Sequence, residues 1–468
     1  MAGAAVVNAR HAPAGGEGQR VLLLVAVSSF LVPAMGSALN VAMPTLGREL
    51  GASAVTLNWI VGAYLVASAS FLLPFGRLAD LVGRRRVFVA GMFAHALASL
   101  GCALAPSAPA LVVVRFLQGA SAAFGFATGM AILISVVPVT SRGKALGIAT
   151  GAVYAGLTVG PVVGGFLTQH LGWRAIFLAS AAVSAAVGLG MRLGVRGEWR
   201  QADGRFDLVG AAAYTLSLAT LMASLSAWRA LGRGRWLLPL AVAGLVLFLV
   251  RQASAPSPLL DLALFRNPVF AFSNVAALIH YAATFGVSFL ISLHLQIVLG
   301  LGPQAAGFVL LTQPAVMTVL SPLAGWVSDR LEPRLVASAG MLLTSAGLVA
   351  LSAVAAGGGV TRVVAPLLLV GAGFGLFSSP NTNAVMSAVE RAHYGVGSAT
   401  LSTMRLVGQA ASLVVVALLF SHFFGSEPVS TASAATLVRS NHVAFLLFAA
   451  LCGLGTAASL ARGRMHRG

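Results

Sequence analysis

The feature that most constrains this chain is a succession of apolar stretches separated by short polar gaps. A helix needs ~20 apolar residues to cross the ~30 Å hydrocarbon layer of a membrane. Fourteen stretches reach or approach that length: 21–43, 57–76, 87–105, 110–136, 145–167, 175–194, 208–228, 236–252, 269–295, 304–324, 335–356, 363–386, 398–421 and 442–461. Only 9% of the 468 residues are charged, against 58% hydrophobic, which excludes a soluble globular protein of this length. We therefore predict an all-α polytopic membrane protein with fourteen transmembrane helices.

The basic residues indicate how the chain is oriented. A net charge of +18 would suit nucleic acid, but the basic residues fall in short gaps between apolar stretches, as the positive-inside rule requires. With both termini in the cytoplasm, 20 of the 29 Lys and Arg residues lie on the cytoplasmic side and 7 lie outside. We expect a multi-pass protein of the inner (plasma) membrane, with both termini cytoplasmic and no nucleic-acid partner.

An internal repeat predicts how the spans are grouped. The segment 76–86 (GRLADLVGRRR) joins two spans and has a weaker copy at 325–334 (GWVSDRLEPR). The two copies start 249 residues apart, whereas six helices with their loops need only about 200 residues. Two extra helices therefore lie between the halves. We predict a cytoplasmic tail (1–20), an N-terminal six-helix bundle (21–194), a linker with two transmembrane helices (195–268), a C-terminal six-helix bundle (269–461) and a short tail (462–468). Duplicated bundles are common in secondary transporters.

Seven motifs occur in an order typical of one family. They are 40–44 (NVAMP), 59–64 (WIVGAY), 76–86, 115–119 (RFLQG), 156–165 (GLTVGPVVGG), 258–267 (PLLDLALFRN) and 295–300 (LQIVLG). With these motifs the chain resembles fourteen-helix members of the major facilitator superfamily, in the drug:proton antiporter group of multidrug and antibiotic exporters. The resemblance covers about Val21 to Leu460. It implies the major facilitator fold, alternating access between two six-helix bundles, and export energised by a proton gradient.

The duplicated turn and the fourth span supply the predicted gating and coupling residues, which are Gly76, Asp80, Gly83, Arg84, Arg115, Gln118, Asp329 and Arg330. Asp80 can pair with a facing helix N-terminus or with an arginine across the cytoplasmic seam, and such a latch would hold one conformation and break in the other. Arg84 and the two arginines after it would either join the gate or contact lipid phosphates. Leu81 replaces a residue that is commonly basic in the family, whereas the second copy keeps both charges.

Two arginines lie inside predicted spans, where a charge needs a partner or a water-filled cavity. Arg115 shares a helix face with Gln118, and the resemblance implies that this arginine takes part in proton handling. An arginine that snorkels toward the outer end of the span is the structural alternative. Arg405 and Gln409 form a similar pair in the thirteenth span.

The fifth span carries the predicted hinge, formed by Gly156, Gly160, Pro161, Gly164 and Gly165. Small residues at this spacing let helices pack closely, and a proline adds a bend. Close packing and hinge motion are compatible, and the resemblance associates this motif with export.

Polar and aromatic residues in several spans are candidates for the substrate cavity. In the ninth span His280, Thr284, Ser288 and Ser292 recur every four residues beside Tyr281, so this stripe faces either a substrate or neighbouring helices. The cavity candidates are Met35, Asn40, Tyr64, His280, Tyr281, Thr284, Gln313, Asn381, Arg405 and Gln409.

The acidic residues are the main departure from the family pattern. Met35 stands where the group usually has an aspartate, and all eleven acidic residues lie in tails, in loops or at span ends. Intramembrane carboxylates are the usual proton relays and the usual partners of cationic substrates. We therefore expect neutral or anionic substrates rather than permanent cations.

Taken together, these patterns predict a monomeric secondary transporter that exports small amphiphilic molecules through the lipid bilayer. It would use the proton gradient, with no cofactor, no bound metal and no enzymatic activity. One alternative is the same fold exporting a metabolite, biosynthetic product or lipid, without proton coupling. A second alternative is a membrane scaffold or receptor that transports nothing.

Overall fold

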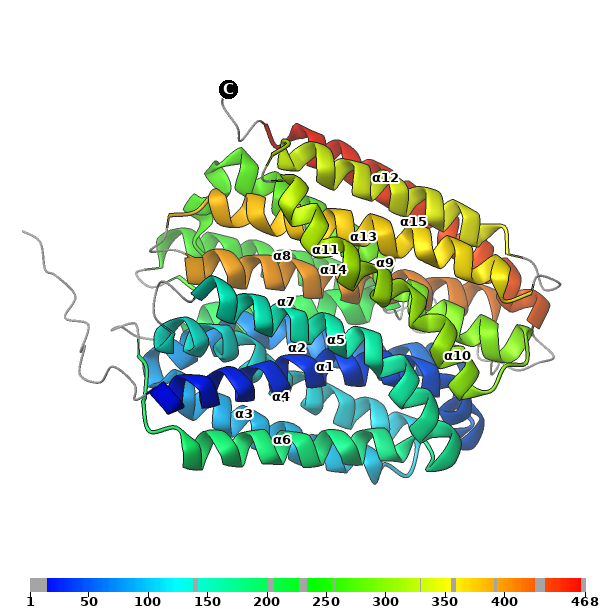
Figure 1. Ribbon diagram of the computed structural model, residues 1–468, viewed down its shortest axis with the longest axis horizontal. Helices are drawn as coiled ribbons and strands as arrows, with labels where there is room; N and C mark the ends of the chain where they lie inside the picture. The colour runs from blue at the N-terminus through cyan, green and yellow to red at the C-terminus, as the bar shows by residue number, and fades with distance from the viewer. Residues whose placement is uncertain are drawn as a thin grey trace, which may run out of the picture.

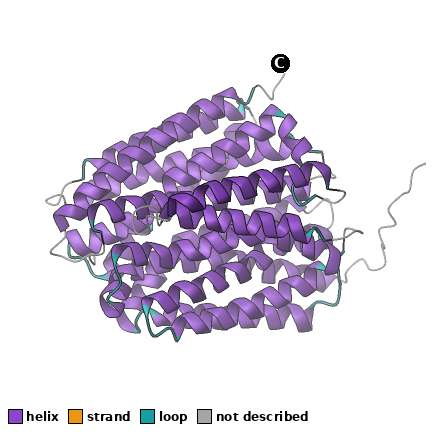
Figure 2. Cartoon of the chain, turned by 180° about the vertical axis from the view of Figure 1, so that it is seen from behind, coloured by secondary structure: helices purple, strands orange, loops and turns teal. Residues whose placement is uncertain are grey.

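The predicted all-α membrane fold is confirmed. A computed structural model of the protein describes residues 15–137, 142–200, 206–226, 234–255, 258–328, 330–354, 359–390, 394–425 and 434–463. Within these ranges the regular structure is helical (Figures 1 and 2). The helices are α1 (Gly15–Leu50), α2 (Ala54–Val82), α3 (Arg84–Ala103), α4 (Ala108–Val136), α5 (Arg142–His170), α6 (Arg174–Gly194), α7 (Leu208–Ser226), α8 (Gly234–Ser254), α9 (Pro268–Leu293), α10 (Pro303–Leu310), α11 (Thr312–Ser328), α12 (Pro333–Ser352), α13 (Thr361–Ser387), α14 (Tyr394–Phe423) and α15 (Ala434–Ala461).

The helices correspond to the fourteen predicted spans. Among the described residues, thirteen helices are long and apolar enough to cross a membrane. Helices α10 and α11 count together as one of these, over Pro303–Ser328. The remaining helix is α7, whose apolar part among the described residues is the shorter stretch Leu208–Leu221. Short turns join several helices, and glycines at the turns adopt the left-handed backbone conformation that side chains disfavour, as at Gly51 and Gly172.

The helices form two bundles joined by a helix pair. Helices α1–α6 pack on one another, with α1 against α5 and α6, α2 and α3 against α4, and α3 against α6. Helices α9–α15 form the second bundle in a similar way, with α13 against α11 and α12, and α15 against α9 and α12. In Figure 1 the first bundle, coloured blue to blue-green, lies below the second, coloured green to red. This arrangement is the major facilitator fold expected from the repeat.

The inserted pair α7–α8 lies beside the junction of the two bundles. Helix α7 packs against α8, against α2 of the first bundle and against α14 of the second. Tyr214 and Thr215 of α7 donate hydrogen bonds to the main-chain oxygens of Ala69 and Ser70 in α2, over 3.0 and 2.9 Å. The pair α7–α8 therefore covers one side of the junction between the bundles.

The two copies of the repeated turn differ in their backbone. Gly83 ends α2 and begins α3 with φ = 128°, a conformation that favours glycine. In the second copy the corresponding residue is Glu332, with φ = −55°, and Pro333 starts α12 there. Proline is favoured at the first position of a helix, so the second turn needs no glycine. Asp329, the acidic residue of this copy, lies outside the described residues.

Candidate functional site

The candidate site is the seam between the bundles, where α1 packs on α9, α2 on α14, and α5 on α10 and α11. The start of α1 and the end of α15 lie at one end of the molecule, called here the termini end. The opposite end, which holds the end of α1 and the start of α10, is called the far end (Figure 1). Each predicted residue can be placed relative to this seam.

The seam is closed at the far end by side chains of α9 that bind main-chain oxygens of α1. Ser292 donates to the oxygen of Asn40 over 2.6 Å, and Gln296 donates to that of Val41 over 2.8 Å. The Asn40 oxygen is free for this bond because Pro44, four residues later, lacks the N–H that would complete the helix. Gln296 belongs to a short π-helical segment, His294–Val298, that ends α9. Pro44 thus leaves one acceptor without its helical partner, and the π-helical segment carries one of the two donors.

Further hydrogen bonds cross the seam between its middle and the far end. Near the far end, Asn58 of α2 donates to the main-chain oxygen of Leu413 over 2.8 Å, and the N–H of Gln304 donates to Gln169 over 3.3 Å. In the middle, the hydroxyls of Tyr154 and Ser378 lie 3.0 Å apart. Thr158 and Thr318 also meet there, with their hydroxyl oxygens 3.2 Å apart. The described residues thus show a conformation closed at the far end.

The predicted hinge glycines serve two different contacts. A Cβ at Gly156, Gly160 or Gly164 would overlap with the main chain of α1 at Phe30, Ala34 or Ala38, so these three glycines pack α5 within its own bundle. Gly165 faces the other bundle instead, where a Cβ would lie 2.6 Å from the Pro303 oxygen and 2.8 Å from Gln304 Cα. Opposite them, a Cβ at Gly307 of α10 would overlap with the main-chain oxygen of Pro161. The absence of side chains therefore allows α5 to approach both neighbours.

Arg115 occupies the centre of a polar cluster inside the first bundle. Its Nε donates to the Ile60 oxygen over 2.9 Å, and its Nη1 donates to Gln118 Oε1 over 2.5 Å. The guanidinium carbon lies 4.3 Å from the ring centre of Tyr64, and Arg115 is only 1% exposed. Gln118 in turn donates to Ser99 over 2.7 Å and lies 3.4 Å from the sulfur of Met35. Arg115, Gln118, Tyr64 and Met35 are therefore one cluster, and Arg115 does not snorkel.

The Asp80 turn is held within the first bundle. Asp80 accepts a hydrogen bond from Arg84 Nε over 2.9 Å, and Arg84 Nη1 also donates to the Ala131 oxygen and to Ser135 of α4. Arg85 caps the end of α6 by donating to the Arg192 oxygen over 2.8 Å. The arginines are thus engaged with protein groups in this conformation, while Gly76 lies inside α2, where a Cβ would touch only Ala127. Arg330, in the second copy, stacks on Trp326 at 3.7 Å.

The predicted polar stripe of α9 divides between two environments. Ser292 reaches the other bundle, as described above, whereas the Thr284 hydroxyl donates to the His280 oxygen of its own helix over 2.8 Å. His280 is fully buried among the rings of Phe374 and Phe377, at 5.0 and 4.1 Å. It therefore lies in the core of the second bundle. Helix–helix contact explains this part of the stripe without a substrate.

Arg405 contacts α13 one turn from the seam contact between Ser378 and Tyr154. Its Nη2 donates to the Thr382 hydroxyl over 2.6 Å, and its guanidinium carbon lies 5.7 Å from the ring centre of Tyr281. Its Nε is buried without a hydrogen-bond partner. Gln409, one turn further along α14, is half-buried, and Gln313 is buried with its side-chain oxygen unpaired.

A buried arginine at the termini end was not among the predicted residues. Arg462 is 1% exposed, and its Nη1 donates to Asn381 Oδ1 over 3.1 Å and to Ser273 Oγ over 3.3 Å. Burial lowers the pKa of this guanidinium to about 10, which leaves it protonated at neutral pH. Asn381 is thus a structural partner of Arg462. Because Arg462 directly follows the last apolar stretch, the sequence suggested a solvated tail residue there.

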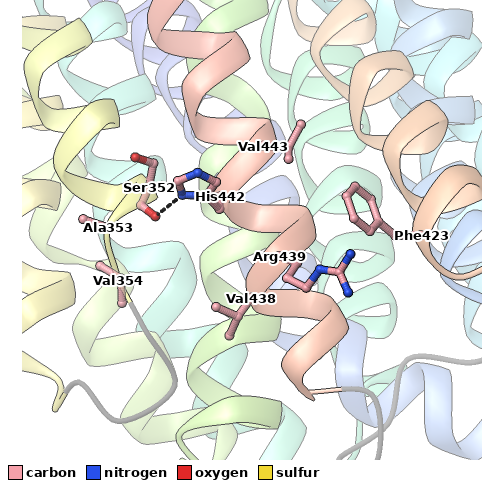
Figure 3. A pocket seen from close by; sticks show the side chains of 8 residues that line it. All are labelled: Ser352, Ala353, Val354, Phe423, Val438, Arg439, His442 and Val443. Atoms are coloured by element: carbon pink, nitrogen blue, oxygen red, sulfur yellow. Dashed lines mark hydrogen bonds between the residues drawn. The ribbon is translucent and has the colours of Figure 1, made fainter.

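A pocket of about 470 Å³ lies at the far end of the second bundle, apart from the seam. Figure 3 shows its lining, which comes from the ends of α12 and α14 and the start of α15. His442 Nδ1 donates to the Ser352 oxygen there over 2.8 Å, and Arg439 lies near Phe423. The predicted site residues do not line this pocket. Groups of acidic, histidine and cysteine residues suited to a metal ion are absent from the described ranges.

The sequence missed the residues that join the bundles through single hydrogen bonds. Tyr154, Asn58, Thr158 and Gln304 are isolated polar residues in apolar stretches, and which face of each helix meets the other bundle depends on packing. Gln296 and Thr158 carried a signal because they lie in family motifs, and Ser292 carried one as a member of the predicted stripe of the ninth span.

Comparisons with known proteins agree with this architecture. The chain is 27% identical to the riboflavin transporter RibZ of Clostridioides difficile over 93% of this chain and 95% of that protein. It is 31% identical to the tetracenomycin C resistance and export protein of Streptomyces glaucescens, over 88% of this chain and 78% of the relative. Among solved structures, a bacterial homolog of the human lysosomal transporter Spinster, in an inward-facing and unoccupied conformation, aligns with a TM-score of 0.71 at 16% identity. That alignment covers 97% of this chain and 100% of the other.

The family model of the Major Facilitator Superfamily matches residues 25–413, and a second match covers residues 273–466. The two bundles, their closed seam and this match over most of the length show that the chain belongs to the Major Facilitator Superfamily.

Proposed function

We propose that this transporter exports small amphiphilic molecules, including antibiotics, across the plasma membrane by alternating access. The observation that carries the proposal is the seam, which is held at one end by single hydrogen bonds between bundles. Such bonds break at a modest cost of about 0.5–1.5 kcal/mol each, as a rocking motion requires. Relatives that export tetracenomycin C and cephamycin support the cargo class.

The proposal includes an orientation and an energy source. Both termini lie in the cytoplasm, because the basic residues are concentrated on that side. The conformation closed at the far end then faces inward. Transport uses the proton gradient, requires no bound cofactor and is carried out by a monomer. Asp80 and Arg84 act in the gate by exchanging their present contacts for partners across the seam when the termini end closes.

The experiment is uptake of a neutral antibiotic into everted membrane vesicles, with and without a pH gradient. Uptake that depends on the protein and falls when the gradient is collapsed is expected. The variant Asp80→Asn should insert normally and lose most of the uptake, since its amide carries no charge for a latch. Uptake that does not depend on the gradient would contradict proton coupling. Uptake by Asp80→Asn at the wild-type rate would contradict a gate role for Asp80.

A metabolite is the second candidate cargo. It is favoured by the similarity to the riboflavin transporter of Clostridioides difficile, which extends over almost the whole of both chains. Proteoliposomes with riboflavin on one side distinguish the two proposals. Riboflavin movement at a rate that exceeds antibiotic movement would favour the metabolite.

A further inference from the structure

We propose that Arg405 is the anion-recognition residue of the seam, so that the preferred substrates are aromatic molecules with one carboxylate. The inference rests on the proposed transport function and specifies the substrate class of the same seam. A positive charge well inside a span needs a partner or water. Arg405 lies eleven residues into α14, or about 16 Å along the helix axis.

Arg405 differs from Arg115 and Arg462 in being partly exposed. Arg115 is 1% exposed and its guanidinium is held by Ile60, Gln118 and the Tyr64 ring. Arg462 is equally buried, at the termini end, and donates to Ser273 and Asn381. Arg405 is partly exposed, donates one hydrogen bond to Thr382 and leaves Nε unpaired. The ion pairs of Asp80, Glu198, Glu49 and Asp207 all lie elsewhere.

The surroundings of Arg405 belong to both bundles. Thr382 and Ser378 lie one turn apart on α13, and Ser378 contacts the hydroxyl of Tyr154 in α5 of the first bundle. Hydrogen bonds therefore lead from Arg405 to the Thr382 hydroxyl, from that hydroxyl to the Ser378 main-chain oxygen, and from the Ser378 hydroxyl across the seam to Tyr154. A ligand group bound at Arg405 would contact elements that move relative to each other, which is the position a transported substrate must occupy.

The chemistry of these groups selects an organic anion. A guanidinium offers paired N–H donors that match a carboxylate. The Thr382 hydroxyl already donates to the Ser378 main-chain oxygen, whereas the Tyr154–Ser378 pair shares one hydroxyl hydrogen and has a second that can donate to a ligand oxygen. The Tyr281 ring lies 5.7 Å from the guanidinium carbon and packs edge-on against Phe374 at 5.2 Å. Aromatic side chains at this distance favour a flat apolar body next to the charge. A cation would be repelled, since the described residues place no carboxylate near Arg405.

The test uses the purified full-length protein in nanodiscs with two probes, 7-hydroxycoumarin-3-carboxylate and its neutral amide. Thermal stabilisation by each probe gives its binding constant for wild type, Arg405→Lys, Arg405→Gln and Thr382→Val. Arg362→Gln is the matched control, because it removes one arginine from the exposed start of α13. We expect the wild type to bind the carboxylate at least ten times more tightly than the amide. Arg405→Gln should abolish that preference, and Arg405→Lys should keep part of it.

Two results would overturn the inference: equal binding of both probes by the wild type, or an unchanged carboxylate preference in Arg405→Gln. If Arg405→Gln does not fold, Arg405→Lys and Thr382→Val provide the test. Each should reduce the preference for the carboxylate over the amide by about three- to tenfold, because a charge-assisted hydrogen bond is weakened. Transport of the carboxylate into proteoliposomes is measured separately. Binding that depends on Arg405 without transport would refute the proposed exporter function and leave the anion site intact.

Discussion

At the residue scale, Arg115 shows why a buried charge can be stable without a carboxylate. The cost of desolvation is offset by hydrogen bonds to Ile60 and Gln118 and by the face of the Tyr64 ring. This arrangement depends on a planar guanidinium with donors that point in different directions. The absence of an acidic partner leaves the cluster with a net positive charge.

We therefore expect Arg115→Lys to reduce transport at least tenfold, because a single ammonium cannot bind Ile60 and Gln118 while stacking on Tyr64. The measurement is vesicle uptake normalised to the amount of folded protein. Uptake by Arg115→Lys equal to that of the wild type would mean that any positive charge suffices at this position.

A second residue-scale prediction concerns Met35, whose sulfur lies 3.4 Å from Gln118 Nε2 and thus beside the Arg115 cluster. A carboxylate there would face Arg115 across a buried space. We expect Met35→Asp to be tolerated in the wild-type background and to destabilise Arg115→Met by about 3 kcal/mol, because that background leaves the new charge unpaired. A double-mutant cycle from chemical denaturation in lipid micelles measures the coupling. Additive effects would show that the two side chains do not meet.

At the element scale, α5 is a helix whose small residues face two directions. Gly164 packs on Ala38 of α1 inside the bundle, and Gly165 packs on Pro303 and Gln304 of the other bundle. Successive residues on a helix point about 100° apart, so neighbouring glycines can have unrelated roles. One contact stays fixed during transport, whereas the other must open.

Gly164 and Gly165 provide a matched test. Gly164→Val should destabilise the fold by about 1–3 kcal/mol, because overpacking separates α5 from α1. Gly165→Val should leave the unfolding midpoint nearly unchanged but prevent closure at the far end and abolish transport. Spin-label distances between α5 and α10 report the closure. A closed far end in Gly165→Val, or equal loss of stability in both variants, would contradict the assignment.

The elements themselves were predictable, and most of their contacts were not. Apolar length and the positive-inside rule predict spans because the bilayer acts on each helix separately. The repeated turn predicts two halves because it, too, can be recognised from a short segment of sequence. The face that each helix presents to the seam depends on tertiary packing, which is why His280 lies in a core while Ser292 crosses between bundles. Arg462 was missed because its burial results from Ser273 and Asn381 on distant helices.

At the scale of the whole molecule, the seam determines which end is closed. Pro44 makes the Asn40 oxygen available, and Ser292 and Gln296 use α1 main-chain oxygens as acceptors. These bonds exist only when the far end is closed, so they bias the equilibrium between conformations rather than the stability of either bundle. A main-chain oxygen that lacks its helical partner also explains why a side chain as small as that of Ser292 is sufficient for the contact.

The final prediction follows from this bias. Each hydrogen bond contributes about 0.5–1.5 kcal/mol, so the double variant Ser292→Ala/Gln296→Ala should lower the ratio of far-end-closed to far-end-open molecules by roughly 5- to 150-fold. Spin-label distances between α1 and α9 should lengthen at the far end, while the unfolding midpoint of each bundle stays the same. Ser288→Ala is the control, since it removes a hydroxyl from the same helix two turns before the π-helical segment. Pro44→Ala should weaken the Ser292 bond and shift the equilibrium in the same direction, because an alanine restores the main-chain N–H that the proline lacks. An unchanged distance distribution in the double variant would show that apolar packing at Gly165 and Gly307, rather than these hydrogen bonds, determines closure.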